Sequence, residues 1–508
     1  MELSRKVLEF HLPGFTLRGL TREKKEVPQP LSEDVREELP TEAQDYIDIL
    51  ERELAKLRAE NKDLKGQLLM QSHNSSKPPS SDGLHKRPVI PGSQRVPSGK
   101  KSGGQPGHRG TTLLPVSRPD RTELHAVVQC GCGTDLSGIK ADRIEVSQAF
   151  DLPLTPIEVT EHHREVKICP CCRSKVTAPL PAGLRGATAE YGPRIKSYAM
   201  YLLNQHLVPV RRVSEILKEL FGVEISIGSL TRWTAELFHG LSAFERDLKQ
   251  ALIRSKAVNF DETGMRCEGS LHWLHSASTS RLTFFGMHAE RGTQAMRDFG
   301  ILPAFRGIAV HDHWKSYFKF EDCLHALCNA HILRELKFLE EIFGERWSGK
   351  MRGLLLAIHD CVVAAQAQGK ALLSRSVKSK FLRAYNKILR SGFRFHATHD
   401  PSFERGTRGR VKQTKGKNLL DRLRDFQTEV LRFMHDFQAP FTNNQGEQDI
   451  RMNKVKQKIS GCFRSFEGAT HFCRIRSYLS TMRKQGESGL EAIRAVLTGE
   501  SLTIAHPP

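Results

Sequence analysis

Three acidic residues, far apart in the chain, are of a type that could carry out metal-dependent chemistry. Asp261 lies in KAVNFDETG and Asp312 in RGIAVHDHW, two segments with the apolar character of strands. The third acid, Glu447, follows Asn443 and Asn444, either of which can cap a helix that begins just before it. Three carboxylates can hold two divalent ions about 4 Å apart, one activating the attacking oxygen and one stabilising the leaving oxygen. We therefore expect phosphodiester chemistry with Mg²⁺ or Mn²⁺, because these hard ions prefer oxygen ligands.

Residues near Asp261 and Glu447 in the sequence offer an alternate acid and a set of cations for this site. Successive side chains of a strand point to opposite faces, so Asp261 and Glu262 cannot both face one site; we choose Asp261 and keep Glu262 as the alternate. Each acid taken singly could instead be a solvated or capping carboxylate. One acid and three cations share a face of the predicted helix: Glu447, Arg451, Lys454 and Lys458. We expect these three cations to contact DNA.

Two clusters of cysteines could form a second, structural metal site. Four thiolates closed to solvent are typical of structural zinc. The predicted ligands are Cys130, Cys132, Cys169 and Cys172, with Cys171 also in the second cluster. The first pair has the spacing C-x-C, and thiolates so close in sequence must strain to chelate one ion. The alternative is a small β-rich module with reduced cysteines.

The elements that must position the three acids are strands and one helix. Residues 256–264, 271–278 and 281–288 are bounded by turn residues and predict an antiparallel meander. A short helix over 293–299 precedes the apolar run that stops at Asp312.

The segment between Asp312 and Glu447 is longer than a strand-to-helix connection needs, so a helical domain must be inserted there. Apolar periodicity predicts helices over 330–343, 353–368 and 379–389. Residues 404–424 carry eight Lys or Arg against two acids and could guide DNA, or form a solvated charged loop.

Residues 211–233 have the spacing of a helix-turn-helix. Gly222 can adopt the positive φ that ends one helix, and Ser226 or Ser229 can cap the next. Arg232 would lie on the exposed side of the second helix and contact DNA. A purely structural helical hairpin is the alternative, because the turn alone does not show DNA contact.

A heptad repeat from Ile47 predicts a dimerising coiled coil. Its a and d positions are Ile47, Leu50, Leu54, Leu57, Asn61, Leu64 and Leu68. A single Asn at an a position favours a parallel two-stranded pairing in fixed register. Because the run covers few heptads, an amphipathic helix packed on its own chain is the alternative.

The charge of the chain favours a polyanionic partner. Its 508 residues include 77 Lys and Arg against 57 Asp and Glu, a formal net charge of +20. Each cation placed on a phosphate releases a condensed counterion, so DNA is the natural partner, and a merely soluble basic surface is the alternative. Between Lys86 and Arg121, a stretch rich in Pro, Gly and Ser carries eight Lys or Arg; it could follow a phosphate backbone or serve as an inert spacer.

The distribution of apolar residues predicts where the protein is located in the cell. The sequence has no apolar leader and no run long enough to cross a bilayer, which predicts a cytoplasmic protein. Its 11 cysteines then favour thiols and metal ligands over a disulfide framework.

Several separate motifs closely resemble the insertion sequence 66 family of DDE transposases. They are NSSKPPSSDG, GGQPGHRG, DET, HDHWKSY, CNAHILREL and NNQGEQDIRMNKVKQKISGCFRS, and the resemblance spans nearly the whole chain from about residue 46. It implies a ribonuclease H-like core with Asp261, Asp312 and Glu447 as the first, second and third catalytic acids. The family's first zinc pair usually reads C-x-x-C-G, and here Gln129 stands in place of its first Cys, so zinc needs Cys130 as a substitute.

The expected fold is a multidomain α+β chain with a ribonuclease H-like mixed α/β core and an all-α insertion. In chain order we expect a leader (1–45), a coiled coil (46–72), a basic linker (73–122), a zinc-binding β module (123–182), a helical DNA-binding domain (183–245), the first part of the core (250–335), the insertion (336–438) and the rest of the core with the Glu447 helix (439–500).

The resemblance also implies a function. Metal-dependent cleavage of insertion-sequence ends would be followed by strand transfer into target DNA, in a bacterial cytoplasm and at the nucleoid when the protein is bound to DNA. Expected partners are double-stranded DNA, a second copy of the chain through the coiled coil, and accessory proteins of the same element, with no membrane.

Two other functions are kept as alternatives. His331 and Arg334 form an H-x-x-R pattern, and Tyr478 could be the nucleophile of a tyrosine-type recombinase. Otherwise His331 and Arg334 would buttress the metal site or bind DNA. The second alternative is a DNA-binding regulator without catalysis.

Overall fold

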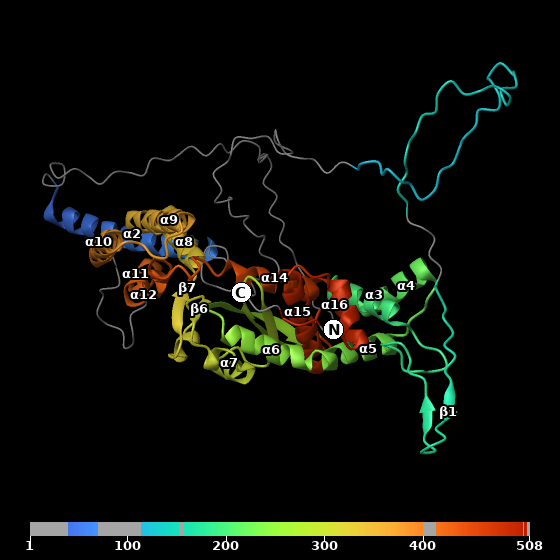
Figure 1. Ribbon diagram of the computed structural model, residues 1–508. Coiled ribbons are helices and arrows are strands. Elements are labelled where there is room, and N and C mark those ends of the chain that lie inside the picture. Colours follow the sequence, from blue (N-terminus) through green and yellow to red (C-terminus); the bar gives the residue numbers. More distant parts are fainter. Residues whose placement is uncertain (1–38, 70–112, 152–156, 400–412, 501, 505–508) are drawn as a thin grey trace, which may run out of the picture. The chain divides into compact units, whose positions relative to one another are not determined.

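The computed structural model describes residues 39–69, 113–151, 157–399, 413–500 and 502–504 (Figure 1). Most of the predicted leader, most of the predicted linker and part of the predicted basic stretch of the insertion lie outside these residues. Within the described part of the chain, no helix combines the length and apolar character needed to cross a membrane.

The first compact unit contains one long helix, α2 (Thr41–Leu69), which confirms the helix predicted from the heptads. Between 46% and 59% of the surface of four heptad leucines is exposed: Leu50, Leu54, Leu57 and Leu64. An exposed apolar seam of this kind fits a helix that pairs with another helix. The pairing itself stays a prediction.

The cysteine-rich segment holds little regular structure. Strands β1 (Val166–Ile168) and β2 (Lys175–Thr177) form a short antiparallel hairpin, and a single bridge joins Gln129 to Asp135. None of the residues described between 113 and 182 is buried. The described residues of the predicted β module therefore build no hydrophobic core of their own.

Four helices follow: α3 (Pro193–Asn204), α4 (Val210–Phe221), α5 (Ile227–Gly240) and α6 (Ser242–Ile253). The predicted break and cap between α4 and α5 are confirmed. Gly222 has a φ of 69°, in the left-handed region, and the Ser226 hydroxyl accepts a hydrogen bond from the Ser229 N–H at 3.1 Å.

A five-stranded mixed sheet forms the centre of the second unit (Figure 1). Its strands are β3 (Ala257–Cys267), β4 (Ser270–Ser278), β5 (Thr283–His288), β6 (Ile308–His311) and β7 (Leu324–Leu327). Their order is β5-β4-β3-β6-β7; β3, β4 and β5 pair antiparallel, and β3, β6 and β7 pair parallel. The predicted meander is confirmed, whereas β7 was not predicted.

The two faces of β3 belong to two different hydrophobic cores. Phe260 packs in a core that also contains residues of α3 to α6, so these helices share their interior with the sheet. Met265 packs in another core with α14 (Asn444–Ser460) and α15 (Phe466–Lys484). Because side chains alternate along a strand, even-numbered residues of β3 face the first core and odd-numbered residues face the second.

The predicted insertion is helical throughout its described residues. It comprises α8 (Asn329–Phe338), a π-helical turn η4 (Leu339–Phe343), α9 (Arg346–Ala367), α10 (Arg375–His399), α11 (Lys415–Asp425), α12 (Gln427–Val430) and α13 (Arg432–His435). Its core is continuous with Val310 of β6 and Ala326 of β7. These helices therefore pack onto one end of the sheet.

The remaining elements are short or terminal. They are the predicted α7 (Thr293–Phe299), two 3₁₀ turns η2 (Leu302–Ala304) and η3 (Tyr317–Lys319), and α16 (Gly489–Thr498). Helix α15 is bound to the sheet edge, since the Ser477 hydroxyl accepts from the Phe285 N–H at 2.8 Å.

Candidate active site

Parallel pairing of β3 and β6 places two of the predicted acids side by side. Asn259 lies opposite Val310 in the register of these strands. Asp261 and Asp312 each follow two residues later, at the same end of the pair. The Trp314 backbone N–H donates to Asp312 Oδ1 at 2.9 Å, which orients this carboxylate.

Helix α14 brings the third acid to the Asp261 face of β3. Glu447 lies in the first turn of this helix. The preceding residue, Gly446, is in close contact with the strand: a Cβ added there would lie 3.4 Å from Asp261 Cβ. The first turn of α14 therefore lies against Asp261, and the three predicted acids occupy one region.

Asn443 anchors α14 to β3. It occupies the predicted cap position, but its side chain makes no capping hydrogen bond. Instead its Nδ2 donates to the Phe260 carbonyl at 2.8 Å, and its Oδ1 accepts from Asn259 Nδ2 at 2.8 Å. The side chain is buried, so both of its polar atoms are satisfied by the strand beside Asp261.

Burial and neighbouring charges raise the pKa of two of the three acids, Asp261 and Asp312. Burial foremost, and then the charges of Glu262, Asp312 and Glu447, raise the pKa of Asp261 well above its usual value. Burial raises the pKa of Asp312 as well, and Glu447 contributes. Negative charge dominates around Asp261, whereas Arg291 and Arg422 partly oppose the rise in the pKa of Asp312. A buried group of carboxylates of this kind can accept a divalent cation. The all-oxygen donor set fits Mg²⁺ or Mn²⁺.

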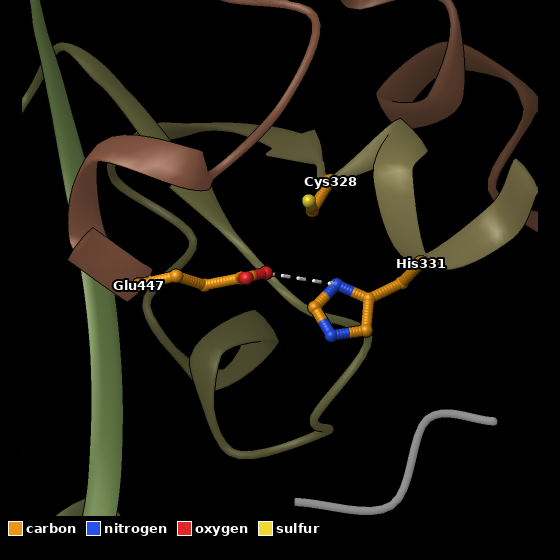
Figure 2. A group of neighbouring side chains, drawn as sticks. All are labelled: Cys328, His331 and Glu447. Carbon is orange, nitrogen blue, oxygen red and sulfur yellow. Dashed lines mark ion pairs between the residues drawn. The ribbon is translucent and has the colours of Figure 1, made fainter. Parts of the chain in front are cut away.

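The Glu447 carboxylate contacts the H-x-x-R pattern on α8 (Figure 2). Its Oε1 lies 3.3 Å from Arg334 Nη2 and 3.7 Å from His331 Nδ1. Burial, and then the charges of Arg334 and Arg422, lower the pKa of His331 to about 3. The imidazole is therefore neutral at ordinary pH, and Arg334 supplies the positive charge beside the third acid.

A thiol completes this group. The donor atoms of Cys328, His331 and Glu447 all lie within 4.8 Å of one another. Among the described residues, this cluster includes neither Asp261 nor Asp312. The three predicted acids thus interact through their charges, while Glu447 makes its closest contacts with α8. Cys328 was not predicted; the signal that could have found it is a Cys three residues before a His at a helix start.

Glu262, the alternate first acid, faces the opposite core. Its side chain is 2% exposed, and its Oε1 accepts from Arg291 Nη2 at 2.6 Å. Its other oxygen accepts from the Tyr317 hydroxyl, and Arg291 lies 4.2 Å above the ring of Trp314. Burial and then the charge of Asp312 raise the pKa of Glu262 to about 7, although Arg291 and Tyr317 oppose this. Arg291 had no signal in the sequence, because its contact with Glu262 is tertiary.

The cysteines form two local pairs. Cys132 Sγ lies 3.2 Å from Thr134 Oγ1, and Cys172 Sγ lies 2.9 Å from Ser174 Oγ. These hydroxyls foremost, together with the neighbouring cysteine of each pair, lower the pKa of Cys132 and Cys172 to about 7. Partly ionised thiols suit metal binding. Zinc at Cys130, Cys132, Cys169 and Cys172 stays a prediction.

The predicted DNA-binding cations differ in exposure. Arg451 and Lys458 of α14 are exposed, and the Arg232 side chain on α5 is 62% exposed. Lys454 is half-buried and donates to the Gly264 carbonyl, so it ties α14 to β3. Contact of these cations with DNA stays a prediction.

A cleft of about 410 Å³ opens beside Glu447. Side chains from α8, α9 and α14 line it, among them Arg334, His359 and Arg451, and Thr442 from the segment before α14 also contributes. The cleft therefore joins the third acid to two arginines, an arrangement suited to an anionic ligand.

The models of two protein families match parts of the chain. The model of the family described as Transposase IS66 family matches residues 189–471, more than half of the chain and all three acids. The model of a family of unknown function (DUF6444) matches residues 27–113. No curated protein matches the chain. On the first of these matches, the chain belongs to the IS66 transposase family.

Proposed function

We propose that the protein cleaves DNA at the ends of an insertion sequence and transfers the cut strands into target DNA, as a DDE-type transposase. Asp261, Asp312 and Glu447 are the proposed catalytic acids of a ribonuclease H-like core. One observation carries the proposal: two parallel strands and a helix bring three carboxylates to one face of the central sheet, where their charges raise the pKa of Asp261.

The residues around the acids hold them in position. Mg²⁺ or Mn²⁺ bound by the three carboxylates would activate the attacking oxygen and stabilise the leaving oxygen. The Trp314 N–H orients Asp312, and Asn443 keeps the first turn of α14 on β3. Acids positioned in this way need little reorganisation when DNA binds.

Two displacements at phosphorus account for the reaction. In the first, water attacks at the element end and loses a proton to solvent, while the bond to the 3′-oxygen breaks and a 3′-hydroxyl is released. In the second, this hydroxyl attacks a phosphorus of the target strand and displaces the target's own 3′-oxygen. No covalent link between protein and DNA forms in either step.

The cleft beside Glu447 is the proposed path of the DNA strand. Arg334 and Arg451 line it, and the exposed Lys458 extends the basic surface of α14. His331 would hold Glu447 from its other side. Arg232 on α5 and Lys454 complete the proposed set of DNA-binding residues, although Lys454 would have to leave the Gly264 carbonyl.

Other parts of the chain would assemble and guide the complex. The exposed heptad leucines of α2 support a homodimer through a coiled coil. The cysteine pairs, with their lowered pKa values, support a structural Zn²⁺. Accessory proteins of the same element and a location at the bacterial nucleoid remain part of the proposal.

A cleavage assay on element-end DNA tests the catalytic assignment. The purified protein is expected to cut with Mg²⁺ or Mn²⁺ and to be inactive with chelator. Asp312→Asn should abolish cleavage and keep DNA binding, measured by gel shift. The matched control is Asp322→Asn, an exposed aspartate on the same segment, which should cut normally. Full activity of Asp312→Asn would remove the assignment.

The two alternatives receive less support. Tyr478 is 1% exposed, and its hydroxyl donates to the Ala492 carbonyl at 3.1 Å, so it is enclosed where a nucleophile must be accessible. A regulator without catalysis would bind DNA equally well but gives no reason for three clustered carboxylates. It predicts that Asp312→Asn changes nothing.

A further inference from the structure

A second kind of metal-ligand group shares the third acid. Cys328 is the residue before α8, and His331 lies in the first turn of that helix, so the two side chains project from the same end of α8. Glu447 faces them from α14 (Figure 2). The three donor atoms lie within 4.8 Å of one another, which is close enough to surround one ion.

One nitrogen of the His331 ring, a potential metal ligand of this group, lacks a hydrogen-bond partner among the described residues. His331 Nδ1 is buried and has no hydrogen-bond partner within the described structure. The nearby Glu447 Oε1, at 3.7 Å, is too far for a hydrogen bond. Buried polar atoms are normally satisfied, and an orphaned imidazole nitrogen between a thiol and a carboxylate is satisfied well by a metal ion.

The three ligand types of this group, a thiol, an imidazole and a carboxylate, favour some metal ions over others. A thiolate and an imidazole favour a borderline-soft ion such as Zn²⁺, whereas Mg²⁺ takes oxygen ligands. Three protein ligands leave one position of a tetrahedral zinc site open. This set therefore differs in preference from the three carboxylates, although both sets contain Glu447.

We propose that Cys328, His331 and Glu447 form a Zn²⁺ site that competes with the catalytic metal for Glu447. Occupation by zinc withdraws the third acid from Asp261 and Asp312 and inhibits cleavage. The inhibitory role rests on the proposed function; the binding site does not. Arg334, 3.3 Å from Glu447 Oε1, competes with zinc for the carboxylate.

Cobalt(II) is the probe for the site, because a thiolate ligand gives it a near-ultraviolet charge-transfer band. The full-length protein is used with Cys130, Cys132, Cys169, Cys171 and Cys172 changed to Ser, so that these thiols give no signal. One thiolate-coordinated Co²⁺ per chain is expected, with its band displaced by Zn²⁺. Cys328→Ser should remove the band, and His331→Ala should weaken binding tenfold or more.

Two controls protect this test. Cys328 Sγ accepts a hydrogen bond from the Asn443 backbone N–H at 3.1 Å. The serine hydroxyl of Cys328→Ser can accept the same hydrogen bond, and thermal unfolding checks that this variant folds. Cys323→Ser, at a buried cysteine outside the group, should leave the band unchanged. A band that survives Cys328→Ser, or no thiolate band at all, would overturn the site.

The inhibitory role is tested separately. Zn²⁺ is titrated into the Mg²⁺-supported cleavage reaction, and each rate is normalised to the zinc-free rate of the same variant. The zinc concentration for half-inhibition should rise tenfold or more in Cys328→Ser. Equal inhibition of both proteins would refute the role of this site. A protein that never cleaves would instead count against the proposed function, and the cobalt spectra would still decide the site.

Discussion

Asp261 and Glu262 are consecutive acids on β3 with opposite surroundings. Asp261 faces α14 and two further carboxylates, whereas Glu262 faces Arg291 and the Tyr317 hydroxyl in the other core. Burial raises the pKa of both. At Glu262 Arg291 supplies the balancing charge, whereas negative charge dominates around Asp261, where the proposed divalent cation would balance it. Strand alternation thus places two adjacent acids in different surroundings.

The largest expected effect is the loss of activity in Asp261→Asn. Cleavage should fall by at least about 10²-fold, because one of three proposed metal ligands is removed. The unfolding midpoint should stay unchanged or rise, since a repelled carboxylate is lost. Cleavage rates and thermal unfolding measure the two quantities, with Asp322→Asn as control. Retained activity would break the comparison between the two acids.

The elements around this comparison were largely predictable from the sequence. Apolar alternation bounded by turns predicted the meander, and Gly222 with Ser226 predicted a helix pair that the structure confirms. These signals are local, because they depend on residues within one or two turns or strands. The same alternation predicted that Asp261 and Glu262 face opposite sides; the family resemblance favoured Asp261, and its catalytic role remains a proposal.

What the sequence could not predict depends on contacts between distant segments. Strand β7 has four residues, which is too short for a periodic signal. Asn443 has a capping position but bonds to a strand more than 180 residues earlier, and no local pattern encodes that choice. Arg291 and Cys328 likewise acquire their roles only when the chain is folded.

The second largest effect is expected from loss of the Asn443 hydrogen bonds that hold α14 on β3. Asn443→Ala leaves Asn259 Nδ2 and the Phe260 carbonyl without their buried partner, which should cost about 2–3 kcal/mol in the free energy of unfolding. Cleavage should fall about tenfold as Glu447 loses its fixed position. Denaturant unfolding and cleavage rates check both. Asn444→Ala, at the exposed neighbour, is the matched control for stability and should leave the free energy of unfolding unchanged.

The pH dependence of stability tests the surroundings of Glu262, on the opposite face of β3 from Asp261. The pKa of Glu262 is about 7 in the folded protein against an ordinary value of 4.5, so its contribution to stability is full below 4.5 and is lost as pH rises through 7. The parent should therefore lose roughly 2–3 kcal/mol more than Glu262→Gln between these limits. Denaturant unfolding across this range gives the difference, which also includes the coupling of Glu262 to Asp261 and Asp312. Identical profiles would show that Arg291 already keeps Glu262 ionised.

The smallest effect is expected at Tyr478, in the same core as Phe260. Tyr478→Phe removes the hydrogen bond to the Ala492 carbonyl and should lower the free energy of unfolding by about 1 kcal/mol, with cleavage and strand transfer unchanged. Denaturant unfolding and strand-transfer assays measure these quantities. Loss of activity in a folded Tyr478→Phe protein, with a covalent protein–DNA adduct in the parent, would move the chemistry away from Asp261. Normal activity of Tyr478→Phe would mean that Tyr478 is structural, and the three acids would remain the proposed catalytic residues.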